Sequence, residues 1–224
     1  MSRISSNNLF NFTDNINYLI SNLQNGIYCS INYERLPLTN NGYKAPMCCF
    51  CDIPLSLIHE HFKWYGRYGI GIKRNYAREL GVKPVWYITS ENNFIKNISK
   101  DKKISEYQRK YVIPYLKQFI GHQLNQKGKN VRKKFYDERE WRYISDTKLV
   151  EPLFGKQLTD KQKQPMSANK RMKIDLTAVE YIFVDNENEV ERIIKELKII
   201  SIGKIKYEYL ISKILTAKKI ETDF

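Results

Sequence analysis

The sequence predicts an α+β protein, and three observations support this fold class. Short strand-like segments alternate with amphipathic helical segments, but they lack the regular strand–helix–strand interval of a doubly wound parallel sheet. The length of 224 residues suits a single domain, and we expect residues 1–224 to form it. Hydrophobic residues make up 42% of the chain, which is enough for a sizeable core and too many for a disordered protein.

In the first half of the chain, apolar residues either alternate with polar ones or recur every three to four positions between Gly, Pro and Asn breaks. The first pattern predicts strands at Leu9–Thr13, Ile27–Ser30, Met47–Cys51, Tyr68–Lys73 and Pro84–Ile88. The second predicts a helix capped by Thr13 or Asp14 that continues to Leu23, helices over Leu55–Trp64 and Asn75–Leu80, and a helix capped by Thr89 or Ser90. We expect Leu36–Ala45 to be a loop.

The second half is predicted to begin with one long helix over Ile104–Leu124, kinked or restarted at Pro114. Its aromatic residues recur every fourth position, which favours a core-facing stripe: Tyr107, Tyr111, Tyr115 and Phe119. The later elements are a strand at Trp141–Ile144, a polar loop over Lys156–Lys170, a strand at Tyr181–Val184, a helix over Glu189–Leu197, a further helical stretch and an apolar Ile214–Thr216.

The positive charge is concentrated in the middle of the chain. The formal net charge is +14, and residues 61–174 alone carry 27 basic and 10 acidic groups, a net +17. The densest cluster is predicted to be an exposed loop with five cations, Lys127, Lys129, Arg132, Lys133 and Lys134. This favours a polyanionic partner, either nucleic acid, a nucleotide or an acidic protein, although the lysines could also form only a solvated surface. If the cluster binds phosphates, removing its five charges should flatten the salt dependence of binding with little effect on stability.

Several classes of protein are disfavoured. No apolar stretch approaches the length of a membrane helix or a signal peptide, so we expect a soluble cytoplasmic protein without a membrane partner. Cys48, Cys49 and Cys51 crowd one strand, which disfavours a disulfide framework. With His59 and His61 they lack the spacing of a zinc site, and we expect no metal.

The sharpest chemical signal is the segment Glu138-Arg-Glu-Trp-Arg142. On a strand, Glu138 and Glu140 would share a face, and two adjacent carboxylates could stabilise a positively charged transition state or hold ribose hydroxyls. Alternatively, both acids could pair with Arg139, Arg142 and nearby lysines on an edge strand. The glycines of Tyr68–Lys73 clear one strand face for a ligand or for tight packing.

Four segments carry a resemblance to a known family: Pro46–Ser56, Tyr65–Ile72, Pro84–Tyr87 and Phe135–Tyr143. Together they resemble the AbiGi-type abortive phage resistance proteins, a family described as the antitoxin half of an abortive-infection pair. The similarity runs from about Leu9 to Phe224, nearly the whole chain.

The opening Leu9-Phe-Asn-Phe-Thr13, followed by Leu19, Leu23 and Gly26, is more distantly similar to the first motif of ADP-ribosyltransferase-like folds. This resemblance implies a split β-sheet core with peripheral helices, and a late strand that carries a catalytic Glu. Glu140, with Glu138, matches that position. The implied NAD-binding residues are Asn11, Thr13, Tyr65, Tyr68 and Gly69, and the implied substrate-selecting segment is the basic stretch Lys127–Lys134. Asn11 stands where relatives are expected to have His; it can still hydrogen-bond a ribose hydroxyl but carries no charge.

Two functions remain open at this point. The first is an NAD-dependent enzyme that transfers ADP-ribose to nucleic acid or protein during phage infection. The second is a non-catalytic basic antitoxin that binds a toxin partner or DNA. For the first, we expect Asn11, Tyr68 and Glu140 to line one pocket, and Glu140→Gln to abolish phage defence while leaving the fold intact.

Overall fold

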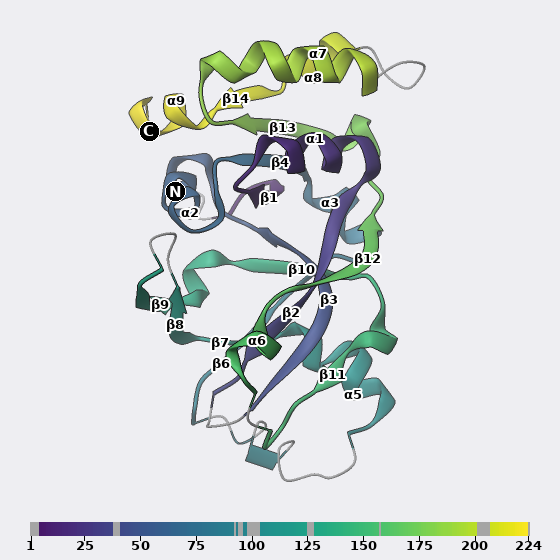
Figure 1. The fold of residues 1–224 in the computed structure, drawn as a ribbon, viewed down its shortest axis with the longest axis vertical. Coiled ribbons are helices and arrows are strands. Elements are labelled where there is room, and N and C mark those ends of the chain that lie inside the picture. Colours follow the sequence, from purple (N-terminus) through teal and green to yellow (C-terminus); the bar gives the residue numbers. More distant parts are fainter. Residues whose placement is uncertain are drawn as a thin grey trace.

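The computed structural model describes residues 5–37, 41–91, 93, 96–97, 104–124, 128–156, 158–200 and 207–223, and it is an α+β protein as the sequence predicts (Figure 1). The strands are β1 (Asn8–Thr13), β2 (Ile27–Arg35), β3 (Gly42–Cys51), β4 (Tyr68–Lys73), β5 (Lys83–Pro84), β6 (Trp86–Ile88), β7 (Leu116–Gln118), β8 (Ile120–Leu124), β9 (Asn130–Lys134), β10 (Glu140–Ile144), β11 (Glu151–Pro152), β12 (Met166–Met172), β13 (Val179–Val184) and β14 (Ile214–Thr216). The α-helices are α1 (Ile16–Asn25), α2 (Ile58–Tyr65), α3 (Arg74–Glu79), α5 (Glu106–Tyr111), α6 (Asp160–Lys163), α7 (Val190–Ile200), α8 (Tyr207–Ile211) and α9 (Ala217–Asp223).

The main sheet consists of two halves joined through β3. Its strand order is β12-β2-β3-β1-β4-β13-β14, with β10 on β3 as well. β2 pairs with the first part of β3 as far as Met47, whereas β1 meets β3 at one residue pair, Phe10 and Cys51. The two ladders therefore leave a short stretch of β3 open between them, where a ligand could approach the backbone.

Three clusters of buried side chains hold these layers together. One lies between the β1–β4–β13 half of the sheet and the helices α1, α7 and α8, of which α7 and α8 lie above β13 in Figure 1. A second, aromatic cluster packs α2 and α9 against the opposite face, with Phe10, Phe62 and Phe183 at its centre. The third packs β3 against β7 and the preceding turn, and contains Tyr43, Met47 and Ile113. Burial of these apolar faces on both sides fixes the register of the central strands.

Most predicted elements of the first half are confirmed. The strand at Tyr68–Lys73 has the predicted bounds, and helix α1 ends where Gly26 adopts a φ of 92°, a conformation that glycine tolerates. The cap of α1 is Asn15, one residue after the predicted Asp14, because its side chain accepts a hydrogen bond from the backbone N–H of Asn17 at 2.8 Å. The helix expected after Thr89 or Ser90 lies largely outside the described residues.

The predicted long helix over Ile104–Leu124 is wrong. Only Glu106–Tyr111 is α-helical; a 3₁₀ turn follows at Ile113–Tyr115, and β7 and β8 complete the segment. Pro114 has no N–H to donate to an α-helical hydrogen bond, and the chain then extends so that Leu116 pairs with Trp86 of β6. The aromatic stripe is a core face only in part, since Tyr115 is buried whereas Tyr107 and Tyr111 are 68% and 50% exposed.

Three predicted loops contain regular structure. The loop at Leu36–Ala45 is shorter than expected because β2 continues to Arg35 and β3 begins at Gly42, while residues 38–40 lie outside the described part of the chain. The loop over Lys156–Lys170 contains α6 and most of β12, which pairs with β2. The basic segment forms β9, a hairpin with β8. In each case pairing with a neighbouring strand overrides a polar local sequence.

The cysteine prediction also needs correction. Cys29 and Cys48 form a disulfide between β2 and β3, whereas Cys49 and Cys51 are free. The pairing partner lies outside the crowded segment, because the antiparallel register that sets Ser30 opposite Met47 also sets Cys29 opposite Cys48. Among the helices that the structure describes, none combines the length and apolar character needed to cross a membrane.

Candidate ligand-binding pocket and its buried ion pairs

A pocket of about 1010 Å³ opens where β1 and β2 separate along β3. Strands β1, β2 and β3 and helix α1 contribute one side of its lining, and α2, β7, β8 and the segment before β10 contribute the other. Five of the residues that the sequence predicts to act together line it: Asn11, Thr13, Tyr65, Glu138 and Glu140. The pocket therefore brings together residues that are about 130 positions apart in the sequence.

Asn11 lies at the point where β3 changes partner from β2 to β1. Its Nδ2 donates a hydrogen bond to the backbone carbonyl of Cys49 at 2.9 Å. This carbonyl belongs to the open stretch of β3, and the Asn11 amide satisfies it in place of a neighbouring strand. The contact fixes the side chain and leaves Oδ1 as an acceptor beside the pocket.

Glu138 and Glu140 reach the pocket by a different backbone path from the predicted one. Glu138 ends a 3₁₀ turn, η3 (Phe135–Glu138), and Glu140 is the first residue of β10. Arg139 between them has a φ of 46°, a left-handed conformation that is uncommon for a residue other than glycine. The two carboxylates therefore share a partner, Lys117, without lying on one regular strand.

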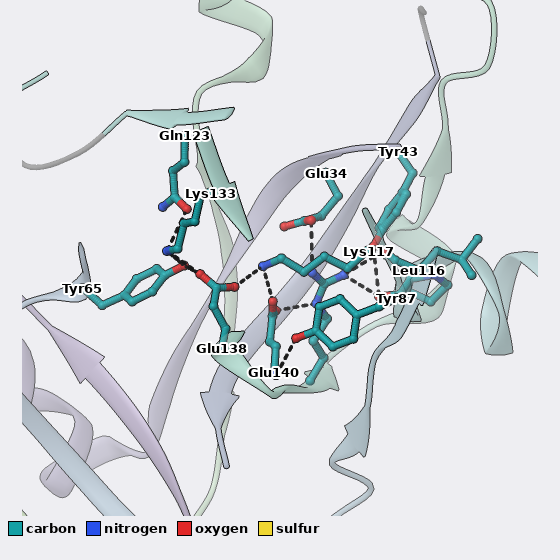
Figure 2. A network of polar contacts seen from close by, with 12 residues as sticks. Glu34, Tyr43, Tyr65, Tyr87, Leu116, Lys117, Gln123, Lys133, Glu138 and Glu140 are labelled. Carbon is teal, nitrogen blue, oxygen red and sulfur yellow. Dashed lines mark hydrogen bonds and ion pairs between the residues drawn. The ribbon is translucent and has the colours of Figure 1, made fainter. Parts of the chain in front are cut away.

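Buried cations surround both carboxylates (Figure 2). Lys117 Nζ lies 2.7 Å from Glu138 Oε2 and also pairs with Glu140 Oε2. Lys133 Nζ lies 2.5 Å from Glu138 Oε1, and Arg142 Nε lies 2.6 Å from Glu140 Oε1. Three acids and three cations, including the 3.1 Å pair between Arg142 and Glu34, thus form one continuous network whose formal charge is balanced.

Aromatic hydroxyl groups complete the network. The Tyr65 hydroxyl donates to Glu138, and the hydroxyl of Tyr87 accepts a hydrogen bond from the backbone N–H of Glu140 at 2.8 Å. Tyr43 and the main-chain carbonyl of Pro114 accept hydrogen bonds from Arg142 Nη1, whose side chain is 0% exposed. Each buried charge therefore has an opposite charge beside it, and Glu138 and Arg142 also have neutral partners.

These contacts determine the ionisation of the pocket. Burial would raise the pKa of Glu140, but Arg142 and Lys117 hold it well below its ordinary value. Burial would lower the pKa of Lys117, but Glu138 and Glu140 raise it well above its usual range. Burial lowers the pKa of His61 to about 4. At neutral pH the two carboxylates and Lys117 are charged, and the His61 imidazole is neutral.

The shifted pKa values predict how stability depends on pH. The folded protein holds the pKa values of Glu138 and Glu140 below the unfolded value, which is about 4.3, so their contribution to stability is present above that pH and is lost as the pH falls further. His61, whose buried imidazole is neutral, adds a loss that begins as the pH falls below its unfolded pKa of about 6.5. We expect urea unfolding to shift to lower urea from that pH downward, and to shift further below about pH 4. Glu140→Gln should weaken this acid dependence. An equally steep loss in both proteins would contradict the assignment.

Two predicted NAD-binding residues lie away from the pocket lining. The Tyr68 hydroxyl donates to Glu189 at 2.8 Å, so the expectation that Asn11, Tyr68 and Glu140 line one pocket is correct for Asn11 and Glu140 only. Gly69 pairs with Phe12, and a Cβ on Gly69 would come within 2.5 Å of the Phe12 ring. This glycine provides room for aromatic packing between β1 and β4. Of the two roles predicted for it, a ligand contact or tight packing, the structure shows the second.

The predicted basic segment divides into two groups. Arg132 and Lys134 are exposed on β9, and Lys129 is exposed before it. Lys133 instead turns inward to Glu138, with its Nζ 3.9 Å from the Trp64 ring centroid. Lys127 lies outside the described residues. Removing all five charges would thus break a buried ion pair, so a small effect on stability is no longer expected.

The sequence prediction missed Lys117 and Glu34 as members of the site. Lys117 falls within the predicted long helix that does not form, and Glu34 has no local motif. Pairing of the acids with cations, the alternative considered from the sequence, is correct for Arg142 and two lysines, although β10 is flanked by β3 and β5 and is not an edge strand. Among the described residues, no group of three or more His, Cys, Asp or Glu could hold a metal ion.

Comparisons with known proteins agree with the similarity seen in the sequence motifs. The family model "Putative abortive phage resistance protein AbiGi, antitoxin" matches residues 32–185. A protein described as "Abortive phage resistance protein AbiGi", from Lactococcus lactis subsp. cremoris, is 26% identical over 249 aligned positions, which cover 88% of this chain and 95% of the relative. No solved structure gives a significant match.

Proposed function

Because the chain belongs to the AbiGi family of abortive phage resistance proteins, we propose that it acts in phage defence through this pocket, as an ADP-ribosyltransferase-like protein that binds NAD. The observation that supports the proposal is the convergence of Asn11, Thr13, Tyr65, Glu138 and Glu140 on one pocket. These residues come from β1, α2 and the segment around β10, and the sequence motifs alone predict all five of them.

The pocket has the size and polar groups that a dinucleotide requires. Its volume of about 1010 Å³ is at the upper end of the usual range for ligand pockets, about 300–1,000 Å³. Asn11 Oδ1 and the Thr13 hydroxyl would accept hydrogen bonds from ribose hydroxyls at one side. Tyr65 and His61, whose ring centroids lie 4.5 Å apart, would provide an aromatic wall.

In the proposed reaction, NAD supplies an ADP-ribosyl group: its bond to nicotinamide breaks, nicotinamide leaves with that electron pair, and the acceptor forms the new bond and releases its proton to water. Glu140 would supply negative charge near the ribose carbon that becomes electron-poor. Its lowered pKa keeps it ionised at neutral pH, so it is suited to electrostatic stabilisation and not to accepting a proton.

A second candidate function is a non-catalytic antitoxin that binds a toxin partner. One observation favours it: both carboxylate oxygens of Glu140 already contact cations, Lys117 and Arg142. These cations compensate the negative charge that a transferase would use, and they would have to remain close to a bound cationic group. In this case the ion pairs would serve the architecture of the pocket and not a reaction.

Nicotinamide release distinguishes the two candidates. We expect the purified protein to release nicotinamide from NAD in the presence of nucleic acid or protein acceptors, and Glu140→Gln to lower the rate about 100-fold or more. The rates should be compared at a temperature where circular dichroism shows both proteins to be folded, because the neutral side chain leaves Lys117 and Arg142 less compensated. A wild-type protein without release, together with a Glu140→Gln variant that still protects cells from phage, would favour the antitoxin.

A further inference from the structure

The end of the pocket away from Glu140 has a different charge balance. At the Glu140 end, Lys117 and Arg142 are paired with carboxylates. At the other end, Arg171 of β12 lines the pocket, and no carboxylate in the described part of the chain lies within ion-pair distance of it. Arg171 therefore brings a positive charge to the pocket that no carboxylate of the described residues compensates by an ion pair.

The Arg171 guanidinium is held in one orientation by neutral oxygens. Nη1 donates to the Gly26 carbonyl at 2.8 Å and to the Ser21 carbonyl at 3.4 Å, and Nη2 donates to the Ser21 hydroxyl at 3.0 Å. These contacts use only part of the five N–H donors of the group. The side chain is thus preorganised for an anion, with less rotamer entropy to lose on binding than a free surface arginine.

An aromatic ring lies beside this cation. Arg171 and Tyr28 are paired residues of β12 and β2, and the guanidinium carbon lies 5.5 Å from the Tyr28 ring centroid. The Tyr28 side chain is 42% exposed and also lines the pocket. Its backbone N–H donates to Asn22 Oδ1 at 3.0 Å, which ties β2 to α1 at this point. The guanidinium lies over one side of this partly exposed ring, and a fixed cation beside an aromatic ring supplies the two groups that bind phosphate and base in nucleotide recognition.

The Tyr28–Arg171 end and Glu140 lie on opposite sides of β3. β12, β2, β3 and β10 are successive neighbours, so Arg171 and β10 are three strand spacings apart, about 14 Å. One nucleotide at Tyr28 and Arg171 would therefore leave the Glu140 end of the pocket open for a second group.

We propose that Tyr28 and Arg171 form a nucleotide subsite, in which the base stacks on Tyr28 and a phosphate contacts Arg171. This subsite rests on the proposed function in one respect: the proposed function assigns NAD to the pocket, and the subsite adds a nucleotide as a second ligand of the same pocket. The nucleotide comes either from a free mononucleotide or from single-stranded nucleic acid, which present the same base and phosphate.

Calorimetric titration with AMP and with a ten-residue oligothymidylate tests this subsite. Arg171→Gln and Tyr28→Leu should each weaken binding of the preferred probe by about tenfold or more. Tyr28→Phe, which keeps the ring, should bind like the wild type. Lys170→Gln is the matched control, because it removes one charge from the same strand at a position that does not line the pocket.

The two probes identify the source of the nucleotide. Binding of AMP alone identifies a free mononucleotide, and tighter binding of the oligothymidylate identifies single-stranded nucleic acid. The subsite is rejected if no probe binds the wild type, or if Arg171→Gln and Tyr28→Leu bind as well as Lys170→Gln. A protein that loses AMP binding in Arg171→Gln but releases no nicotinamide would keep the subsite and refute the transferase. A protein that releases nicotinamide, and whose Arg171→Gln variant still binds AMP as the wild type does, would refute the subsite alone.

Discussion

Lys117→Met should destabilise the protein by about 3–5 kcal/mol, because it removes one partner of a buried ion pair and leaves uncompensated charge behind. Lys117 is the shared partner of Glu138 and Glu140, and all three side chains are buried. Without it the two carboxylates repel each other in a region of low dielectric constant, so their pKa values should rise. The measurement is the free energy of unfolding in urea at pH 7.

Two further variants test whether the loss of stability comes from the buried ion pairs and not from removing any lysine. Lys110→Met removes a lysine whose ion pair with Glu106 is at the surface, and it should change stability little. Lys117→Met combined with Glu140→Gln should be more stable than Lys117→Met alone, because the pairs Lys133–Glu138 and Arg142–Glu34 then remain and balance each other's charge. If Lys117→Met unfolds at the same urea concentration as Lys110→Met, the network does not contribute as described.

Ser30→Phe should abolish phage defence by filling the pocket without touching the ion pairs. Ser30 lies on β2 among the residues that line the pocket, opposite Met47. A phenylalanine is well tolerated on a strand, and its ring would occupy space that a ligand needs. We expect phage to form plaques on cells with this variant about as efficiently as on cells without the protein.

The control for this experiment is Ser212→Phe, at an exposed position after α8 that does not line the pocket. Soluble protein levels should be matched by immunoblot, since reduced abundance would also reduce defence. Full protection by Ser30→Phe would show that the pocket is not needed for defence, whichever ligand it holds.

The sequence predicts the local elements of this fold well where apolar periodicity and glycine breaks agree. The strand at Tyr68–Lys73 and the helix that stops at Gly26 are examples. The prediction fails at Ile104–Leu124. Aromatic residues that recur every fourth position indicate a helix, but Leu116 pairs with Trp86 and the chain there is an extended strand. This pairing is a tertiary contact that no local pattern contains.

In the candidate site, too, local motifs predict some residues correctly and miss those that depend on strand pairing. The motif around Glu140 and the opening strand correctly indicate that Asn11 and Glu140 line one pocket. Lys117 was missed because its role depends on the strand that replaces the predicted helix. Arg171 was missed because only the pairing of β12 with β2, in a region whose sequence predicts a polar loop, brings it beside Tyr28. The positions of Lys117 and Arg171 depend on which strands pair, and the composition of the sequence does not contain this information.

Titration of NAD into the purified protein tests the central claim most directly. We predict that the wild type binds NAD at one site per chain, and that Ser30→Phe, which fills the pocket, shows no binding while Ser212→Phe binds normally. Ser30→Phe that binds NAD as tightly as the wild type, or a folded wild type that binds no NAD, would contradict the account.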